Sequence, residues 1–129
     1  MIRVYQPALT DAQIVAINSG NDVGHIYDRY LKATINVSWD RVCNAFEFYR
    51  HAFDVATDSP EVVFEQTNIG GDLVEWRADR PKSGSVGDVL IADGSNRGWI
   101  CDSFGWIELS RDQVRYFETK VSTVMHLVS

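Results

Sequence analysis

The side chains best suited to chemistry in this 129-residue chain are four carboxylates of its second half: Asp88, Asp93, Asp102 and Glu108. Paired carboxylates perform acid–base work when burial separates their pKa values. Asp88 follows a glycine and Asp93 opens a turn, so both are expected to accept hydrogen bonds from turn amides. Asp102 stands within a predicted strand, where aspartate is disfavoured, and should face solvent or be held by a partner such as Arg97 or a backbone amide. A small enzyme or ligand-binding domain that uses Asp88, Asp102 and Glu108 in a cleft stays open as an alternative.

The histidines and cysteines do not form a recognisable site. The three histidines lie in separate segments without metal-ligand spacing: His25, His51 and His126. Glu47, His51 and Asp54 follow at helical spacing and could hold a metal if another element supplied ligands, but an exposed charge pair explains them more simply. Cys43 and Cys101 are expected to be buried small hydrophobes, because neither lies in a Cys/His cluster. The sequence therefore predicts no catalytic residue, no metal site and no cofactor.

Helices are predicted in the first half from capping signals and apolar spacing. Thr10 and Gln13 form a capping box that opens a helix over residues 10–20, and a second helix follows over residues 22–34. A third is predicted over residues 38–53 because apolar side chains recur there at three- and four-residue steps: Trp39, Val42, Cys43, Phe46, Tyr49 and Phe53. A fourth begins at Ser59-Pro60, with proline at the first helical position, and ends at Gly70.

Strands are predicted at the N-terminus and throughout the second half. Residues 2–5 alternate apolar and polar before Pro7, which indicates a short strand at a sheet edge. Residues 73–76, 86–92, 98–104 and 106–109 are the later strands, with a hairpin turn at residues 93–96 and a sharp bend at Gly105. A second capping box at residues 110–113 starts a C-terminal helix, although the β-branched residues 121–124 leave a terminal strand as the competing interpretation.

This order of elements predicts an α+β fold in which N-terminal helices pack on a small antiparallel C-terminal sheet, closed by a C-terminal helix. Residues 1–129 are expected to form one domain, mainly helical over residues 1–71 and mainly β over residues 72–129. The length is close to the common size of a single domain.

The charge and hydropathy of the chain exclude two classes of partner. The net charge is −6, and without a basic stripe nucleic-acid binding is not expected. No run of about 18 apolar residues is present, so no membrane association is expected. The N-terminus lacks the apolar run of a signal peptide, which predicts a cytoplasmic location.

Two short stretches resemble a known signature. Ser85-Val86-Gly87-Asp88-Val89, followed by Asp102-Ser103-Phe104-Gly105-Trp106, resembles the "SVGDV … DSFGW" signature of YodL-like modules. Such modules occur in small, uncharacterised proteins of tailed phages and in large proteins of conjugative elements. The resemblance implies a phage or mobile-element accessory protein made inside a bacterium, of a kind suspected of countering restriction or CRISPR systems. It carries over no catalytic residue.

The expected function is therefore noncatalytic: the chain binds and modulates a host protein in the bacterial cytoplasm, for example as an inhibitor of host defence. The contact is expected to use acids and aromatics of residues 85–109: Asp88, Asp93, Trp99, Asp102, Phe104 and Trp106. Exposed aromatic side chains are common anchors in protein interfaces. An exposed hairpin edge also makes a homodimer compatible with the sequence.

Overall fold

The fold is α+β, as predicted. The computed structural model describes residues 1–22, 24–78 and 84–128, with side chains described as far as residue 122. The strands are β1 (Ile2–Pro7), β2 (Tyr49–Val55), β3 (Val74–Trp76), β4 (Val89–Ala92), β5 (Arg97–Asp102) and β6 (Gly105–Leu109). The helices are α1 (Asp11–Asn18), α2 (Ile26–Thr34), α3 (Trp39–Cys43), α4 (Pro60–Ile69) and α5 (Arg111–Val128), with a 3₁₀ turn, η1 (Phe46–Phe48).

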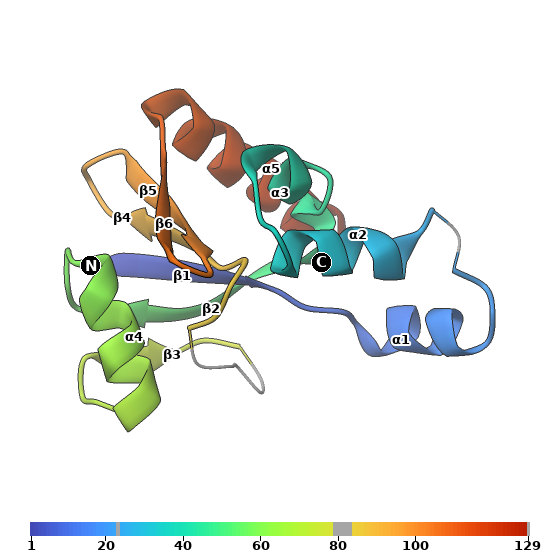
Figure 1. Ribbon diagram of the computed structural model, residues 1–129, viewed down its shortest axis with the longest axis horizontal. Coiled ribbons are helices and arrows are strands. Elements are labelled where there is room, and N and C mark those ends of the chain that lie inside the picture. Colours follow the sequence, from blue (N-terminus) through green and yellow to red (C-terminus); the bar gives the residue numbers. More distant parts are fainter. Residues whose placement is uncertain (23, 79–83, 129) are drawn as a thin grey trace.

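The strands form one antiparallel sheet with the order β3-β2-β1-β4-β5-β6. Figure 1 shows α2, α3 and α5 on one side of this sheet and α4 on the other, while α1 projects from the body. Each side has its own buried cluster: Phe117 of α5 and Ile100 belong to the first, and Val63 of α4 and Trp99 to the second. Because the central strands are covered on both faces, their side chains are apolar with little alternation.

The first strand lies at the centre of the sheet, and the prediction that it forms an edge is wrong. β1 pairs with β2 on one side and with β4 on the other. Pro7 is tolerated because it is the last residue of the strand and lies beyond the residues that pair with β4. Ile2 and Val4 are fully buried, so the strand joins the two halves of the chain into one sheet.

The helix predicted over residues 38–53 is only partly present. Helix α3 ends at Cys43, and after the 3₁₀ turn the chain continues as β2, which pairs with β1 over its whole length. Both faces of β2 are covered, so its run of apolar residues fits helical spacing as well as a buried strand. The predicted start of this helix is confirmed, because the Ser38 hydroxyl caps α3 by accepting a hydrogen bond from the Arg41 amide.

The start signals of three other helices are confirmed by the structure, whereas the helix predicted over residues 22–34 begins only at Ile26. Thr10 and Gln13 form both hydrogen bonds of a capping box at α1. Pro60 starts α4, and Gly70 ends it in the left-handed conformation with φ +63°. The capping box of Ser110 and Gln113 opens α5, which runs as a helix rather than as a terminal strand.

Candidate functional site

The turn before β4 is built around the carboxylate of Asp88. Its Oδ2 accepts hydrogen bonds from the backbone N–H of Ser85 and from Nε2 of Gln6, both at 3.0 Å. Asp88 is 1% exposed, and its carbonyl accepts a hydrogen bond from the Cys101 amide. The expected bond from a turn amide is therefore confirmed. Asp88 was also predicted to contact a partner, but in this structure the buried carboxylate fastens the turn to β1.

Gly87 lets the same turn pack closely against α2. Its φ is +94°, and a Cβ placed there would lie 2.2 Å from the carbonyl oxygen of Ala33. The hydroxyl of the buried Tyr49 donates a 2.6 Å hydrogen bond to the Gly87 carbonyl, and burial raises the pKa of Tyr49 well above its usual value. The S-V-G-D-V stretch thus has a packing role. Gly87 allows the close approach to α2, and Asp88 holds the turn by hydrogen bonds.

The second half of the signature forms a tight hairpin between β5 and β6. Asp102 pairs with Gly105, so Ser103 and Phe104 alone make the connection. The Asp102 carboxylate closes the turn by accepting a 2.7 Å hydrogen bond from the Ser103 amide. Phe104 is 100% exposed. The strand predicted over residues 98–104 therefore ends at Asp102, and the last aromatic residue of that stretch is presented at the hairpin tip.

The two tryptophans of this hairpin are much less accessible than Phe104. Trp99 is 6% exposed and belongs to the core on the α4 side of the sheet. Trp99 was predicted to contact a partner, but in this structure the chain's own core covers its ring. Trp106 is half-buried, and its ring lies 4.9 Å from that of Phe64 in α4, measured between centroids. Of the three aromatics predicted for the contact, the structure leaves Phe104 and part of Trp106 to solvent.

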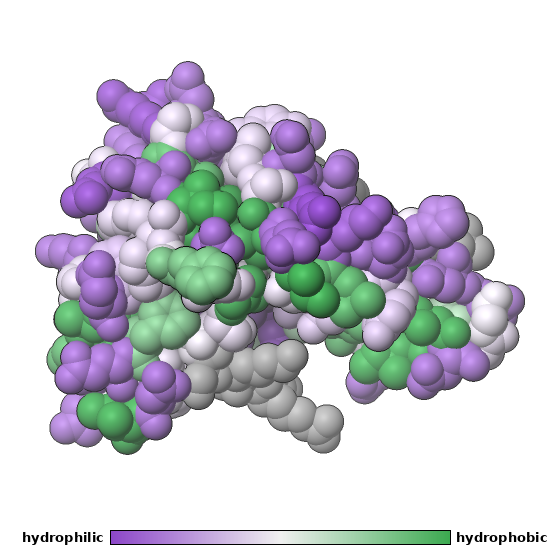
Figure 2. All heavy atoms as spheres, in the orientation of Figure 1, coloured by the Kyte–Doolittle hydropathy of each residue, from purple (hydrophilic) through white to green (hydrophobic). Residues whose placement is uncertain are grey.

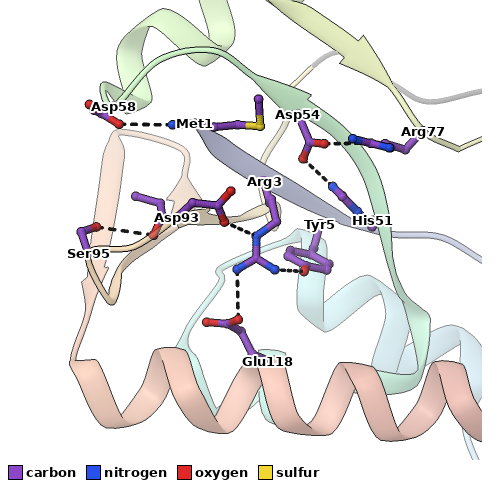
Figure 3. Close-up of polar contacts among 11 residues, drawn as sticks. Met1, Arg3, Tyr5, His51, Asp54, Asp58, Arg77, Asp93, Ser95 and Glu118 are labelled. Carbon is purple, nitrogen blue, oxygen red and sulfur yellow. Dashed lines mark hydrogen bonds and ion pairs between the residues drawn. The ribbon is translucent and has the colours of Figure 1, made fainter.

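Asp93 lies at the other end of the sheet, in a polar network around Arg3 (Figure 3). Arg3 Nε lies 2.7 Å from Asp93 Oδ1, and Arg3 Nη2 lies 3.0 Å from Glu118 Oε2 in α5. Arg3 Nη1 also donates to the hydroxyl of Tyr5, whose pKa burial raises. The network ties β1, the β4–β5 turn and α5 together. Asp93 is therefore held within the chain, far along the sheet from the Phe104 tip.

The charged residues around His51 do not form the arrangement considered for a metal. Glu47 belongs to η1 and pairs with Arg29, whereas His51 lies in β2. His51 Nε2 lies 2.6 Å from Oδ1 of Asp54, and the second oxygen of Asp54 accepts from Nε of Arg77 at 2.8 Å. The simple pairing of His51 with Asp54 is confirmed, although Asp54 is buried between its partners rather than exposed.

Neither cysteine has the character of a nucleophile. Burial, with nearby Asp88 and Asp102, raises the pKa of the Cys101 thiol to about 12. The pKa of Cys43 is also raised, chiefly by burial and then by Asp40. Since the thiolate is the reactive form, both side chains are held in their unreactive form near neutral pH. Cys101 is buried as predicted, whereas Cys43 is only partly covered.

Of the four carboxylates predicted for the site, Asp93 lies beside a hollow that the described residues form. A hollow of about 350 Å³ lies beside the β4–β5 turn, and Asp58, Asp93, Arg97 and Trp99 help to line it. Asp88, Asp102 and Glu108 are not among its lining residues. Glu108 points to solvent near Arg97, at 3.9 Å, while Asp88 is buried. Within the part of the chain that the structure describes, Asp88 and Asp102 thus each close a turn, and Glu108 lies at the surface.

A second exposed apolar area was not expected from the sequence. Helix α1 has no buried residue; Ile14 is 42% and Val15 65% exposed. Tyr27 of α2 is also about half exposed. Figure 2 shows hydrophobic side chains over the projecting α1 and the adjoining side of α2. The apolar spacing in α1 had indicated a face turned towards a core, but only the tertiary arrangement shows that the helix stands away from it.

No family model, curated protein or solved structure matches this chain. Among the described residues, no three histidine, cysteine or acidic side chains are placed to hold a metal ion. In the same part of the chain, no helix has both the length and the apolar character needed to cross a membrane. The geometry of the hairpin is therefore the main guide to function.

Proposed function

We propose that this chain is a noncatalytic accessory protein of a phage or mobile element that binds and modulates a host protein in the bacterial cytoplasm. The host protein would be a component of a defence system, such as restriction or CRISPR. The observation that carries the proposal is the fully exposed Phe104 at the tip of the β5–β6 hairpin. The sequence resemblance supplies the phage context.

The hairpin is suited to binding because it presents Phe104 from a preorganised turn. The connection is only two residues long and is closed by the Asp102 carboxylate, so little conformational freedom is lost when a partner covers the ring. Burying a phenylalanine side chain contributes about 1.5–3 kcal/mol. A single ring of this kind can therefore act as the central anchor of a protein contact.

The charges near the tip indicate which kind of partner surface would fit. Asp102 flanks the turn, the side chain of Glu108 is 68% exposed on β6, and the whole chain carries a net charge of −6. A complementary surface would have an apolar pocket for Phe104 with basic residues around it. Such charge complementarity mainly increases the association rate and makes binding weaker at high salt.

The test is capture from bacterial lysate with the wild-type chain and two matched variants. Phe104→Ser removes the exposed ring at the hairpin tip, and Val15→Ser makes a similar apolar-to-polar change on α1 at a residue that is 65% exposed. Neither change removes core packing, so both variants should melt close to the wild type. We expect the partner retained by wild type and Val15→Ser to bind Phe104→Ser about 30-fold more weakly or worse, as for a binding hot spot.

Two results would count against the proposal. Equal retention by Phe104→Ser and wild type would show that the hairpin tip is not the contact. Loss on Val15→Ser alone would transfer the contact to the exposed apolar residues of α1. If lysates from several bacterial hosts yield no protein that depends on either residue, the binding function itself is wrong.

A further inference from the structure

Strand β6 ends the sheet with an unpaired outer edge. It is last in the strand order, and among the described residues no backbone hydrogen bond joins it to any strand except β5. In Figure 1 it lies in the foreground, with no helix or strand drawn in front of it. Its sequence, Gly-Trp-Ile-Glu-Leu, has neither the proline nor the lysine that often blocks such edges. An edge of this kind is able to accept another strand.

The hydrogen bonds of Cys101 show which groups of β6 point outwards. The Cys101 amide donates to the Asp88 carbonyl, and its carbonyl accepts from the Gly87 amide. Both groups thus point towards β4, so Cys101 and its partner Trp106 form a pair without hydrogen bonds to each other. The N–H and C=O of Trp106 must then point to the outer edge. By the alternation of an antiparallel ladder, those of Glu108 do the same.

We propose that β6 pairs with β6 of a second copy of this chain, antiparallel and centred on Ile107. In this register Trp106 of each copy faces Glu108 of the other, so that both outward-pointing residues of each strand exchange their N–H···O bonds. Ile107 lies opposite Ile107 on the two-fold axis. The result is an isologous contact, the commonest kind in homodimers, that joins two sheets into one.

Neighbouring registers are less favourable for specific reasons. Moving the centre to Glu108 would place two carboxylates directly opposite each other, which destabilises a strand pair. Moving it to Trp106 would place Glu108 opposite Phe104, which lies in the turn and outside the strand, so hydrogen-bonded pairs would be lost. The register centred on Ile107 therefore combines the most hydrogen bonds with no like-charged pair. The net charge of −6 on each copy opposes association, so the dimer should become tighter as salt rises.

Sedimentation velocity over a concentration series tests the proposal with two variants of one residue. Glu108→Pro removes the outward N–H while sparing the bonds to β5, and proline is tolerated on an edge strand when its N–H side faces solvent. Glu108→Ala removes the same side chain and keeps the N–H. We expect wild type and Glu108→Ala to reach twice the 14.6 kDa chain mass, and Glu108→Pro to dimerise about 30-fold more weakly.

Disulfide trapping gives a second test that does not depend on the proline variant folding. Under oxidation Ile107→Cys should yield a covalent dimer, because residues at a non-hydrogen-bonded antiparallel position have Cα atoms about 4.5 Å apart, close enough for a disulfide. Glu108→Cys should not, since Trp106 of the other copy lies opposite. The two native cysteines are the same in both variants and in the wild type, so any cross-linking they cause appears in all three.

The proposal is overturned if the wild type stays monomeric at every concentration, or if a folded Glu108→Pro dimerises as well as Glu108→Ala. Equal cross-linking at positions 107 and 108 would also overturn the register. A monomer whose β6 edge instead takes a peptide from another protein would show that the occupant is heterologous. Dimerisation is measured on the purified chain and host binding by capture with Phe104→Ser, so failure here is distinguishable from failure of the host-binding function.

Discussion

Adding one methyl group at Gly87 tests the packing of the turn before β4 against α2. In a Gly87→Ala variant the new Cβ would lie 2.2 Å from the carbonyl oxygen of Ala33 and 3.2 Å from its carbonyl carbon. Both atoms belong to the backbone at the end of α2, so no side chain can rotate to make room. The residue also has φ +94°, a conformation that alanine rarely adopts.

The expected destabilisation has two contributions. Holding alanine at positive φ costs about 1–2 kcal/mol, and shifting α2 away from the methyl group costs about 1–3 kcal/mol, as for other overpacked sites. The free energy of unfolding should therefore fall by about 2–5 kcal/mol. For a domain of this size, each kcal/mol lowers Tm by about 4 °C, so a fall of about 8–20 °C is expected.

Gly94→Ala is the matched control. Gly94 has φ +77°, but a Cβ there would have nothing within 4 Å, so this variant carries the backbone cost alone. Urea and thermal unfolding followed by circular dichroism should show Gly87→Ala to be less stable than Gly94→Ala by about 1–3 kcal/mol. Equal stability of the two variants would refute the close approach of Gly87 to Ala33.

Two further outcomes concern the neighbours of this turn. Tyr49→Phe removes the hydroxyl that donates to the Gly87 carbonyl at 2.6 Å, and urea denaturation should show a loss of about 1 kcal/mol; unchanged stability would mean that this bond contributes nothing. Because the pKa of the Cys101 thiol is raised to about 12, the folded state holds this proton more tightly than the unfolded state. Its contribution to stability is then complete below the ordinary thiol pKa and is lost as pH rises towards about 12. Iodoacetamide at about pH 8 should accordingly label Cys101 only after unfolding, and rapid labelling of the native protein would contradict its burial.

Much of the local structure could be predicted because its signals are local. A capping box depends on residues three apart, so Thr10 and Ser110 mark the starts of α1 and α5 without knowledge of the fold. Strand β2 could not be predicted in this way. Its apolar residues fit both the spacing of a helix and that of a buried strand. The strand forms because this segment makes hydrogen bonds to β1, which lies more than forty residues earlier in the chain.

The candidate site was located by its sequence only in outline. Residues 85–109 do contain the exposed hairpin, and Asp102 and Phe104 lie together at its tip. Asp88 and Trp99 are buried, because the turn and β5 lie between layers that are distant in sequence. Alternation along a strand indicates which side chains share a face, but it does not say whether that face is covered.

The sequence by itself determined that this chain has helices with defined starts, a hairpin-rich second half and an acidic surface. These properties depend on short-range hydrogen bonding, glycine conformations and composition. Tertiary structure decided that β1 is central, that α1 stands away from the core, and that Phe104 rather than Trp99 meets solvent. Each of these depends on which distant element covers a face or pairs with an edge, and local preferences do not specify such long-range contacts.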